Sequence, residues 1–269
     1  MNKEQLKVFY NKTKHIDGWF SLEAALLINA IDAFQKSIDV RGNVFEIGVH
    51  HGKSSVLFAN LLASGEQLNI CDVFDSQEDN VSSSGKGSRS IFLENIKKYS
   101  NTEITTIHTC LSSELSPDKI GQQYRLFHID GGHNTDEALF DLILASKTLH
   151  EKGIIILDDP FRIEWPGVTE ALLEFLKQNE DFEAIVVGFN KLLVCKKAVA
   201  KLYIDFIDNI DTRDRVGLGY PYSYKKLPFA GSELRIFYVL SSMNANGLKE
   251  VVTKTIFDSK IYKWYKGKK

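Results

Sequence analysis

Short apolar runs rich in β-branched residues alternate with stretches of helical spacing, and this alternation limits the possible folds more than any other feature of the chain. The predicted strands are 43–47, 67–73, 103–109, 124–129, 153–157, 182–189 and 191–196. The predicted helices between and after them are 53–63, 88–99, 135–150 and 168–179. Continuous apolar strands separated by helices are typical of βαβ units, whose parallel sheet is buried on both faces. The sequence therefore predicts a doubly wound α/β fold.

The last two runs, 182–189 and 191–196, are separated only by a short turn around Asn190. Because so tight a connection joins antiparallel strands, we expect a mostly parallel, seven-stranded, Rossmann-like sheet with an antiparallel terminal strand. Ser21 is expected to cap an amphipathic helix that packs onto this core. Three parts follow from the pattern: an N-terminal helical lead-in at 1–40, the α/β core at 41–197, and a C-terminal extension at 198–269 that forms a cap or an oligomer contact.

Charge and cysteine content exclude several classes of protein. The chain has 33 Lys and Arg against 35 Asp and Glu, which gives no general attraction for nucleic acid or an anionic membrane. Its polar N-terminus lacks the apolar core of a signal peptide, and no run of about 18 apolar residues occurs, so a cytoplasmic protein is expected. The three widely spaced cysteines predict neither a disulfide framework nor a Cys-rich zinc site.

The first predicted strand leads into a glycine-containing turn and then a helix. Gly48 and Gly52 would let a ligand approach the backbone, and the N–H groups at the helix start favour negative groups. The dinucleotide pattern fails because His50 occupies its second glycine position, and the P-loop pattern fails because its two glycines are one residue too close. A nucleoside triphosphatase stays an alternative, since Gly52-Lys53-Ser54 and the apolar strand before Asp158-Asp159 both resemble that class.

An acid stands at the end of the second predicted strand. Asp72 lies 72 − 48 = 24 residues after Gly48, close to the interval of about 20 residues at which doubly wound folds place a ribose-binding carboxylate. A ribose diol can donate two hydrogen bonds to such a group. A plain turn after the strand is the alternative.

Three further acids follow neighbouring strands: Asp130 ends the fourth, and Asp158 with Asp159 ends the fifth. Because ligands bind beyond the carboxyl ends of such strands, we expect these carboxylates to converge there. Unpaired anions so close would raise one another's pKa unless a cation lies among them. Oxygen ligands suit Mg²⁺, Mn²⁺ or Ca²⁺, so a metal site is predicted; a metal-free site whose aspartates bind substrate hydroxyls directly stays open.

A histidine three residues after Asp130 is expected to face the same opening. An imidazole can accept a proton at neutral pH, so His133 is our candidate general base, with Asp130 as its catalytic neighbour. Two alternatives stay open for His133. It would either contact a metal or the substrate, or pack against the helix that begins near Asn134.

Together these motifs resemble the class I S-adenosylmethionine-dependent methyltransferases. More closely, the chain is similar to bacterial small-molecule O-methyltransferases of the macrolide-sugar and cephalosporin-pathway type, with a site like that of catechol O-methyltransferases. The resemblance covers about residues 16–197 and is carried by 46–54, 128–133 and 156–159. It implies a set of residues that bind S-adenosylmethionine: Glu46, Gly48, Gly52, Ser54, Asp72 and Ser112.

The resemblance also implies a reaction. Methyl would pass from S-adenosylmethionine to a hydroxyl of a small molecule such as a sugar or a glycosylated metabolite, and a divalent cation would fix that hydroxyl and lower its pKa. The expected partner is this small substrate, with neither nucleic acid nor membrane, and a homo-oligomer is allowed. A non-catalytic interaction protein that keeps the cofactor pocket is a further alternative.

Overall fold

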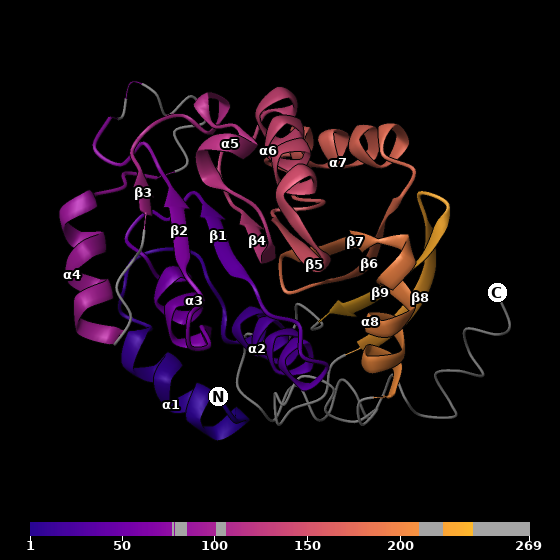
Figure 1. The fold of residues 1–269 in the computed structure, drawn as a ribbon, viewed down its shortest axis with the longest axis horizontal. Coiled ribbons are helices and arrows are strands. Elements are labelled where there is room, and N and C mark those ends of the chain that lie inside the picture. Colours follow the sequence, from indigo (N-terminus) through magenta and orange to yellow (C-terminus); the bar gives the residue numbers. More distant parts are fainter. Residues whose placement is uncertain (77, 79–84, 101–105, 210–222, 239–269) are drawn as a thin grey trace, which may run out of the picture.

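A computed structural model describes residues 1–76, 78, 85–100, 106–209 and 223–238 (Figure 1). Its strands are β1 (Asn43–Ile47), β2 (Leu68–Cys71), β3 (Thr106–His108), β4 (Tyr124–Ile129), β5 (Leu149–Asp158), β6 (Phe182–Gly188), β7 (Lys191–Lys196), β8 (Ser223–Phe229) and β9 (Ser232–Tyr238). Its helices are α1 (Lys3–Thr13), α2 (Leu22–Ser37), α3 (Ser55–Leu61), α4 (Arg89–Tyr99), the 3-10 turn η2 (Ser112–Glu114), α5 (Pro117–Ile120), α6 (Thr135–Thr148), α7 (Pro166–Gln178) and α8 (Lys197–Asn209).

The strands form one sheet in the order β3-β2-β1-β4-β5-β7-β6-β9-β8. Strands β1 to β5 pair with one another in parallel, which confirms the prediction of a doubly wound sheet. The chain leaves β1 toward β2 and β3 on one side and returns to β4 and β5 on the other. This reversal of strand order between β1 and β4 is the switch point at which such sheets bind ligands.

Helices cover both faces of the sheet, because successive residues of a strand point to opposite sides. Val44 on β1 packs in the core shared with α1 to α4 and α8, whereas its neighbour Phe45 packs in the core shared with α5 to α7. Figure 1 shows the corresponding layers, with α2 and α3 on one side of the sheet and α5, α6 and α7 on the other. Buried strands of this kind explain the continuous apolar runs in the sequence.

Strand β7 is antiparallel to both β5 and β6, as the short turn at Asn190 predicts. Phe189 and Asn190 have φ of 56° and 64°, the two consecutive left-handed residues that a tight hairpin turn requires. The register of β7 on β5 sets Lys191 opposite Asp158. The turn and this register therefore place the first residue of β7 beside the carboxyl end of β5, where the acids lie.

The predicted number of seven strands is wrong, because the described residues form nine. The two additional strands, β8 and β9, are a hairpin from the C-terminal extension that joins the sheet through β9 and β6. The edge strand β8 carries Lys225, Lys226 and Pro228, residues that are common at exposed sheet edges. Because of them, its sequence lacks the alternation of apolar and polar residues by which a strand is recognised. Residues 210–222 and 239–269 of the extension lie outside the described residues, and its role as a cap or oligomer contact stays a prediction.

The N-terminal segment packs on the sheet through α2. Ser21 caps this helix as predicted, since its Oγ accepts a hydrogen bond from the Ala24 N–H at 3.1 Å. Most predicted strand and helix positions agree with the structure, although residues 103–105 of the third predicted strand lie outside the described part. In the part of the chain that the structure describes, no helix is both long and apolar enough to cross a bilayer.

A buried arginine ties α2 to the centre of the sheet. Arg125 on β4 is fully buried, and its guanidinium lies 2.9 Å from an oxygen of Asp32 and 2.8 Å from one of Glu66. The same group donates to the side chain of Gln35 and to the Leu61 carbonyl. A guanidinium that has this many hydrogen-bond and ion-pair partners can stay charged in the protein interior.

We expect Arg125→Met to lower the free energy of unfolding by about 3–5 kcal/mol, because Glu66 would stay buried without its cation and Asp32 would keep only Lys36. Urea unfolding at pH 7 measures this change. Arg41→Met is the matched control, since Arg41 pairs with Asp39 at the surface and its loss should cost less than about 1 kcal/mol. Similar losses in the two variants would contradict the proposed importance of the buried network.

Candidate functional site

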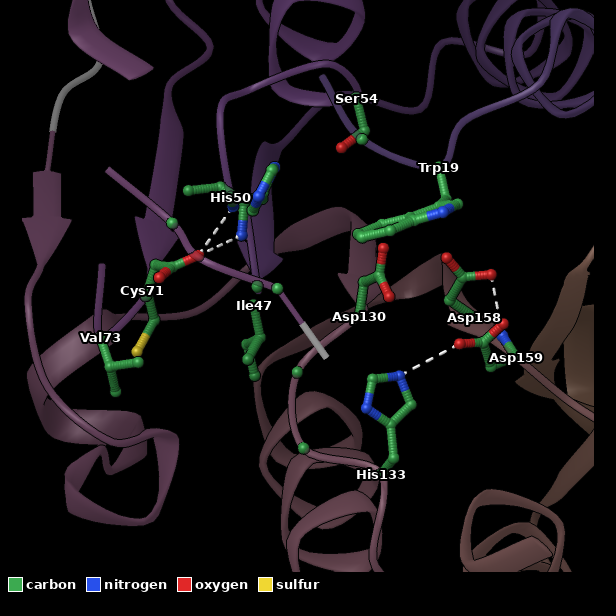
Figure 2. A pocket seen from close by; sticks show the side chains of 18 of the residues that line it. Trp19, Ile47, His50, Ser54, Cys71, Val73, Asp130, His133, Asp158 and Asp159 are labelled. Atoms are coloured by element: carbon green, nitrogen blue, oxygen red, sulfur yellow. Dashed lines mark hydrogen bonds and ion pairs between the residues drawn. The ribbon is translucent and has the colours of Figure 1, made fainter. Parts of the chain in front are cut away.

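A cavity of about 310 Å³ opens at the carboxyl ends of β1, β2, β4 and β5. The loop after each of these strands contributes to its lining, and so does the segment that leads into α2. In Figure 2, Asp130, Asp158 and Asp159 group at one end of the cavity, with Cys71 and Val73 toward the other. The cavity therefore extends along the edge of the sheet, across the switch point between β1 and β4.

The loop after β1 requires glycine. Gly48 has φ of +77°, and a Cβ built on it would lie 1.8 Å from the backbone oxygen of Asp130. Gly52 has φ of +85°, and its Cβ would lie 2.9 Å from the Phe92 ring. The first glycine thus lets the loop lie directly against the end of β4, and the second allows α4 to pack beneath the helix start.

The carboxylate of Asp72 holds this loop in place. Its Oδ2 accepts hydrogen bonds from the backbone N–H groups of Val49 and His50, at 2.6 and 2.8 Å. Its Oδ1 accepts one from the Phe74 N–H at 2.6 Å, which is the turn contact considered as the alternative. Asp72 also lines the cavity, and its contact with a ribose stays a prediction.

Of the six residues expected to bind the cofactor, Gly48, Ser54, Asp72 and Ser112 line the cavity. Glu46 and Gly52 do not belong to the lining. Glu46 is fully buried and accepts hydrogen bonds from Ser54 Oγ at 2.5 Å and from the Ser55 hydroxyl, while His128 Nδ1 lies 2.9 Å from it. Glu46 therefore shapes the pocket indirectly, by orienting Ser54.

The residues that resemble a P-loop are engaged by other protein groups. Lys53 Nζ donates to the Gly18 carbonyl at 2.7 Å, and Ser54 Oγ donates to Glu46. In a phosphate-binding loop the lysine and the hydroxyl instead reach the nucleotide and its magnesium. These contacts argue against the nucleoside triphosphatase alternative.

A buried acid lies below the cavity floor near Ser112. Asp141 on α6 is fully buried, and a Cβ on Gly131 would lie 3.0 Å from its Oδ2. Burial raises the pKa of Asp141 to about 7, although the nearby Ser112 hydroxyl favours the charged form. The folded protein therefore keeps this carboxyl protonated well above the pKa near 3.9 of an unfolded aspartate.

This raised pKa predicts a dependence of stability on pH. Between about pH 4 and 7 the folded chain binds one more proton than the unfolded chain, so stability falls as pH rises through this window and stays low above it. Asp141→Asn removes the titration. We expect the variant to gain about 2–3 kcal/mol relative to the wild type between pH 5 and pH 8. Urea unfolding at both pH values measures the gain, and a constant difference between the proteins would contradict the assignment.

The three predicted acids and the predicted base all line the same end of the cavity. His133 Nε2 lies 3.1 Å from Asp159 Oδ2, and its ring stacks on Trp165 with centroids 4.4 Å apart. At this end of the cavity, two sets of three side chains have ligand atoms that all lie within 4.8 Å of one another. The sets are His128, Asp130 and Asp158, and Asp130, His133 and Asp159. These oxygen-rich sets have the donor chemistry of a divalent cation site.

The environment shifts the pKa of two of these acids in opposite directions. Burial and the neighbouring charge of Asp158 raise the pKa of Asp130 well above its usual range. Burial alone would also raise the pKa of Asp159, but hydrogen bonds from neighbouring side chains hold it well below the usual range. These donors are His133, Asn190 and Arg162. Asp159 is thus the ionised partner that orients His133.

The sequence reasoning missed the cation that the structure does place among the acids. Lys191 at the start of β7 is 1% exposed, and its Nζ forms an ion pair with Asp158 Oδ2. Asn190 Nδ2 donates to Asp158 Oδ1 at 2.9 Å and to Asp159 Oδ1 at 2.5 Å. The sequence alone does not predict these contacts, because a lysine at the end of a strand is usually exposed to solvent. They follow from the register of β7 on β5.

Aromatic side chains border the acid end of the cavity. Trp19, from the segment before α2, is 70% exposed although it lines the cavity, and its ring lies 5.9 Å from that of His50. Trp165 lines the cavity as well and supports His133. Exposed aromatic faces of this kind suit a planar ring or a sugar.

Comparisons with known proteins agree with the fold and the site. Residues 45–160 match the family model of a methyltransferase domain. The O-methyltransferase NovP is 14% identical, with a TM-score of 0.56 over 67% of this chain and 82% of that one. An O-methyltransferase from Bacillus cereus, solved in complex with SAH, is 14% identical, with a TM-score of 0.51 over 72% of this chain and 91% of that one.

A third solved structure, the SAH-bound Podospora anserina methyltransferase PaMTH1, is 15% identical, with a TM-score of 0.50 over 73% of this chain and 88% of that one. None of the curated proteins compared with the chain matches it. These findings confirm the resemblance suggested by the motifs. Residues 45–160 thus match a methyltransferase domain, and the chain has the fold of the class I S-adenosylmethionine-dependent methyltransferases.

Proposed function

We propose that this protein transfers the methyl group of S-adenosylmethionine to a hydroxyl oxygen of a small molecule, such as a sugar or a glycosylated metabolite. The observation that carries the proposal is that one continuous cavity joins the glycine loop after β1 to the acid end formed by β4 and β5. The matched methyltransferase domain contains all of these elements. The likeness to NovP, an O-methyltransferase, supports transfer to oxygen.

The cofactor would lie at the loop end of the cavity. Gly48 keeps the loop against the end of β4 beside this part of the cavity, Asp72 would face the ribose, and Ser112 would face the adenine. The SAH bound by the Bacillus cereus and Podospora anserina proteins supports this choice of cofactor. The loop is held by Asp72 before the cofactor binds, so little ordering is required on binding.

In the proposed reaction a lone pair of the acceptor oxygen forms a bond to the methyl carbon. The carbon–sulfur bond breaks, and its electron pair returns to sulfur, which becomes neutral. His133 accepts the hydroxyl proton. Because ionised Asp159 accepts the hydrogen bond from Nε2–H, Nδ1 is the nitrogen of His133 that takes this proton.

The acids of the cluster would hold the acceptor. Asp130, Asp158 and Asp159 offer carboxylate oxygens to an acceptor hydroxyl, and these oxygens are also of the chemical type that Mg²⁺, Mn²⁺ or Ca²⁺ prefers. A divalent cation, if held by these acids, would supply an electrophile toward the acceptor hydroxyl. Trp19 would cover the acceptor ring from the opposite side.

An acceptor screen tests this function. The protein is incubated with S-adenosylmethionine and panels of nucleotide sugars, glycosylated compounds and catechols, with and without Mg²⁺, and release of S-adenosylhomocysteine is measured. We expect release above the background without acceptor for at least one hydroxylated compound. His133→Ala is expected to lower that rate about a hundredfold or more without weakening cofactor binding. Turnover of that compound at the wild-type rate by His133→Ala would contradict the assignment of the base.

A further inference from the structure

The acid cluster contains a cation that belongs to the chain itself. Lys191 Nζ is paired with Asp158 and lies 5.4 Å from the centre of the Phe20 ring, which shields it from water. The antiparallel register of β7 on β5 sets this position, so the place of the ammonium is fixed by the sheet and not by a loop. Burial opposes the charge of the ammonium, and its ion pair with Asp158 offsets that cost.

Protein donors occupy all four carboxylate oxygens of Asp158 and Asp159. Asp158 Oδ1 accepts from the Asp159 N–H and from Asn190, and its Oδ2 is paired with Lys191. Asp159 Oδ1 accepts from Arg162 and Asn190, and its Oδ2 is hydrogen-bonded to His133. A metal ion that used both acids would have to share or displace these donors.

The charges of the cluster are also largely balanced. Lys191 is buried, and Arg162 lies at the rim with its Nη1 3.1 Å from Asp159 Oδ1. At most three carboxylate charges face these two cations, so the net charge is −3 + 2 = −1 or closer to zero. A divalent ion would enter a site of small net charge and lie beside a fixed positive group. Both conditions weaken its binding.

We propose that Lys191 is a positioning residue that acts as the resident cation of the acid cluster, so that the cluster binds a divalent ion only weakly and methyl transfer continues without one. The proposal rests on the proposed function, since it concerns the cation that would assist that reaction. Lys191 orients Asp158 and sets the local charge, while Asp130 and His133 face the acceptor. The ammonium thereby supplies part of the field that a metal would otherwise provide.

Titration with Mn²⁺ alone, followed by the loss of the electron paramagnetic resonance signal of the free ion, tests the proposal. We expect weak binding to the wild type and binding at least about tenfold tighter to Lys191→Met, because the variant frees Asp158 and removes a positive charge. A merely structural defect would not raise the affinity for an ion. Lys191→Arg keeps the charge and should bind as weakly as the wild type.

Lys226→Met is the matched control, because Lys226 pairs with Asp208 on a different part of the sheet. It should leave the affinity for Mn²⁺ unchanged. Equal affinities of the wild type and Lys191→Met would overturn the proposal. If Lys191→Met does not fold, the wild type decides the question, because stoichiometric binding of Mn²⁺ at micromolar protein overturns the proposal and weak binding supports it. Cofactor does not enter this titration, so its outcome is separate from that of the proposed function.

Discussion

Gly48→Ala is expected to destabilise the fold by more than about 4 kcal/mol and to abolish binding of S-adenosylmethionine. The new Cβ would lie 1.8 Å from the backbone oxygen of Asp130, and no rotation of a side chain can relieve a clash between two backbone segments. The residue would also be held at φ of +77°, a conformation that disfavours a Cβ. The loop after β1 must therefore move away from β4, and the cavity between them loses its shape.

Gly65→Ala provides the control for the backbone conformation alone. Gly65 has φ of +84°, but a Cβ on it meets no atom within 4 Å. We expect a loss of about 1–2 kcal/mol and an unchanged affinity for the cofactor. Urea unfolding and calorimetric titration of both variants measure the difference. If Gly48→Ala behaves like Gly65→Ala, the close contact between the loop and β4 is not required for the site.

Asp130→Ala is expected to lower the rate of methyl transfer about a hundredfold or more while leaving cofactor affinity nearly unchanged. Asp130 belongs to both sets of ligand atoms at the acid end, and it lies at the end of β4 beside the proposed base. Removing its carboxyl deletes a group that would hold either the acceptor hydroxyl or a cation. The rate of S-adenosylhomocysteine release with the acceptor found in the screen measures the effect.

Asp136→Ala is the matched control for this prediction, since Asp136 is an exposed acid in the first turn of α6 and lies outside the cavity lining. It should keep the wild-type rate. A wild-type rate in Asp130→Ala would remove the acid cluster from the mechanism. If Asp130→Ala loses both cofactor binding and activity, Asp130 shapes the pocket and does not act on the acceptor.

Features with strong local signals were predictable from the sequence. The buried strands β1, β4 and β7 have the predicted bounds, because their apolar runs are continuous and end at turns or polar residues. The cluster of Asp130, Asp158 and Asp159 was also predictable, since parallel strands end at the same edge of a sheet. These inferences need only the order of the strands.

Features that depend on pairing between distant segments were not predictable. Lys191 meets Asp158 through the register of β7 on β5, and no local pattern in the sequence encodes that register. The hairpin of β8 and β9 was missed because an edge strand with lysines and a proline lacks the pattern of a buried one. Glu46 was expected to bind the cofactor, and its burial beneath Ser54 could not be predicted, because it depends on how α3 packs on β1.

Calorimetric titration of the wild-type protein with S-adenosylmethionine, and separately with ATP, each with and without Mg²⁺, tests the central claim most directly. The account predicts one S-adenosylmethionine bound per chain under both conditions and no binding of ATP. Binding of ATP without binding of S-adenosylmethionine would contradict it.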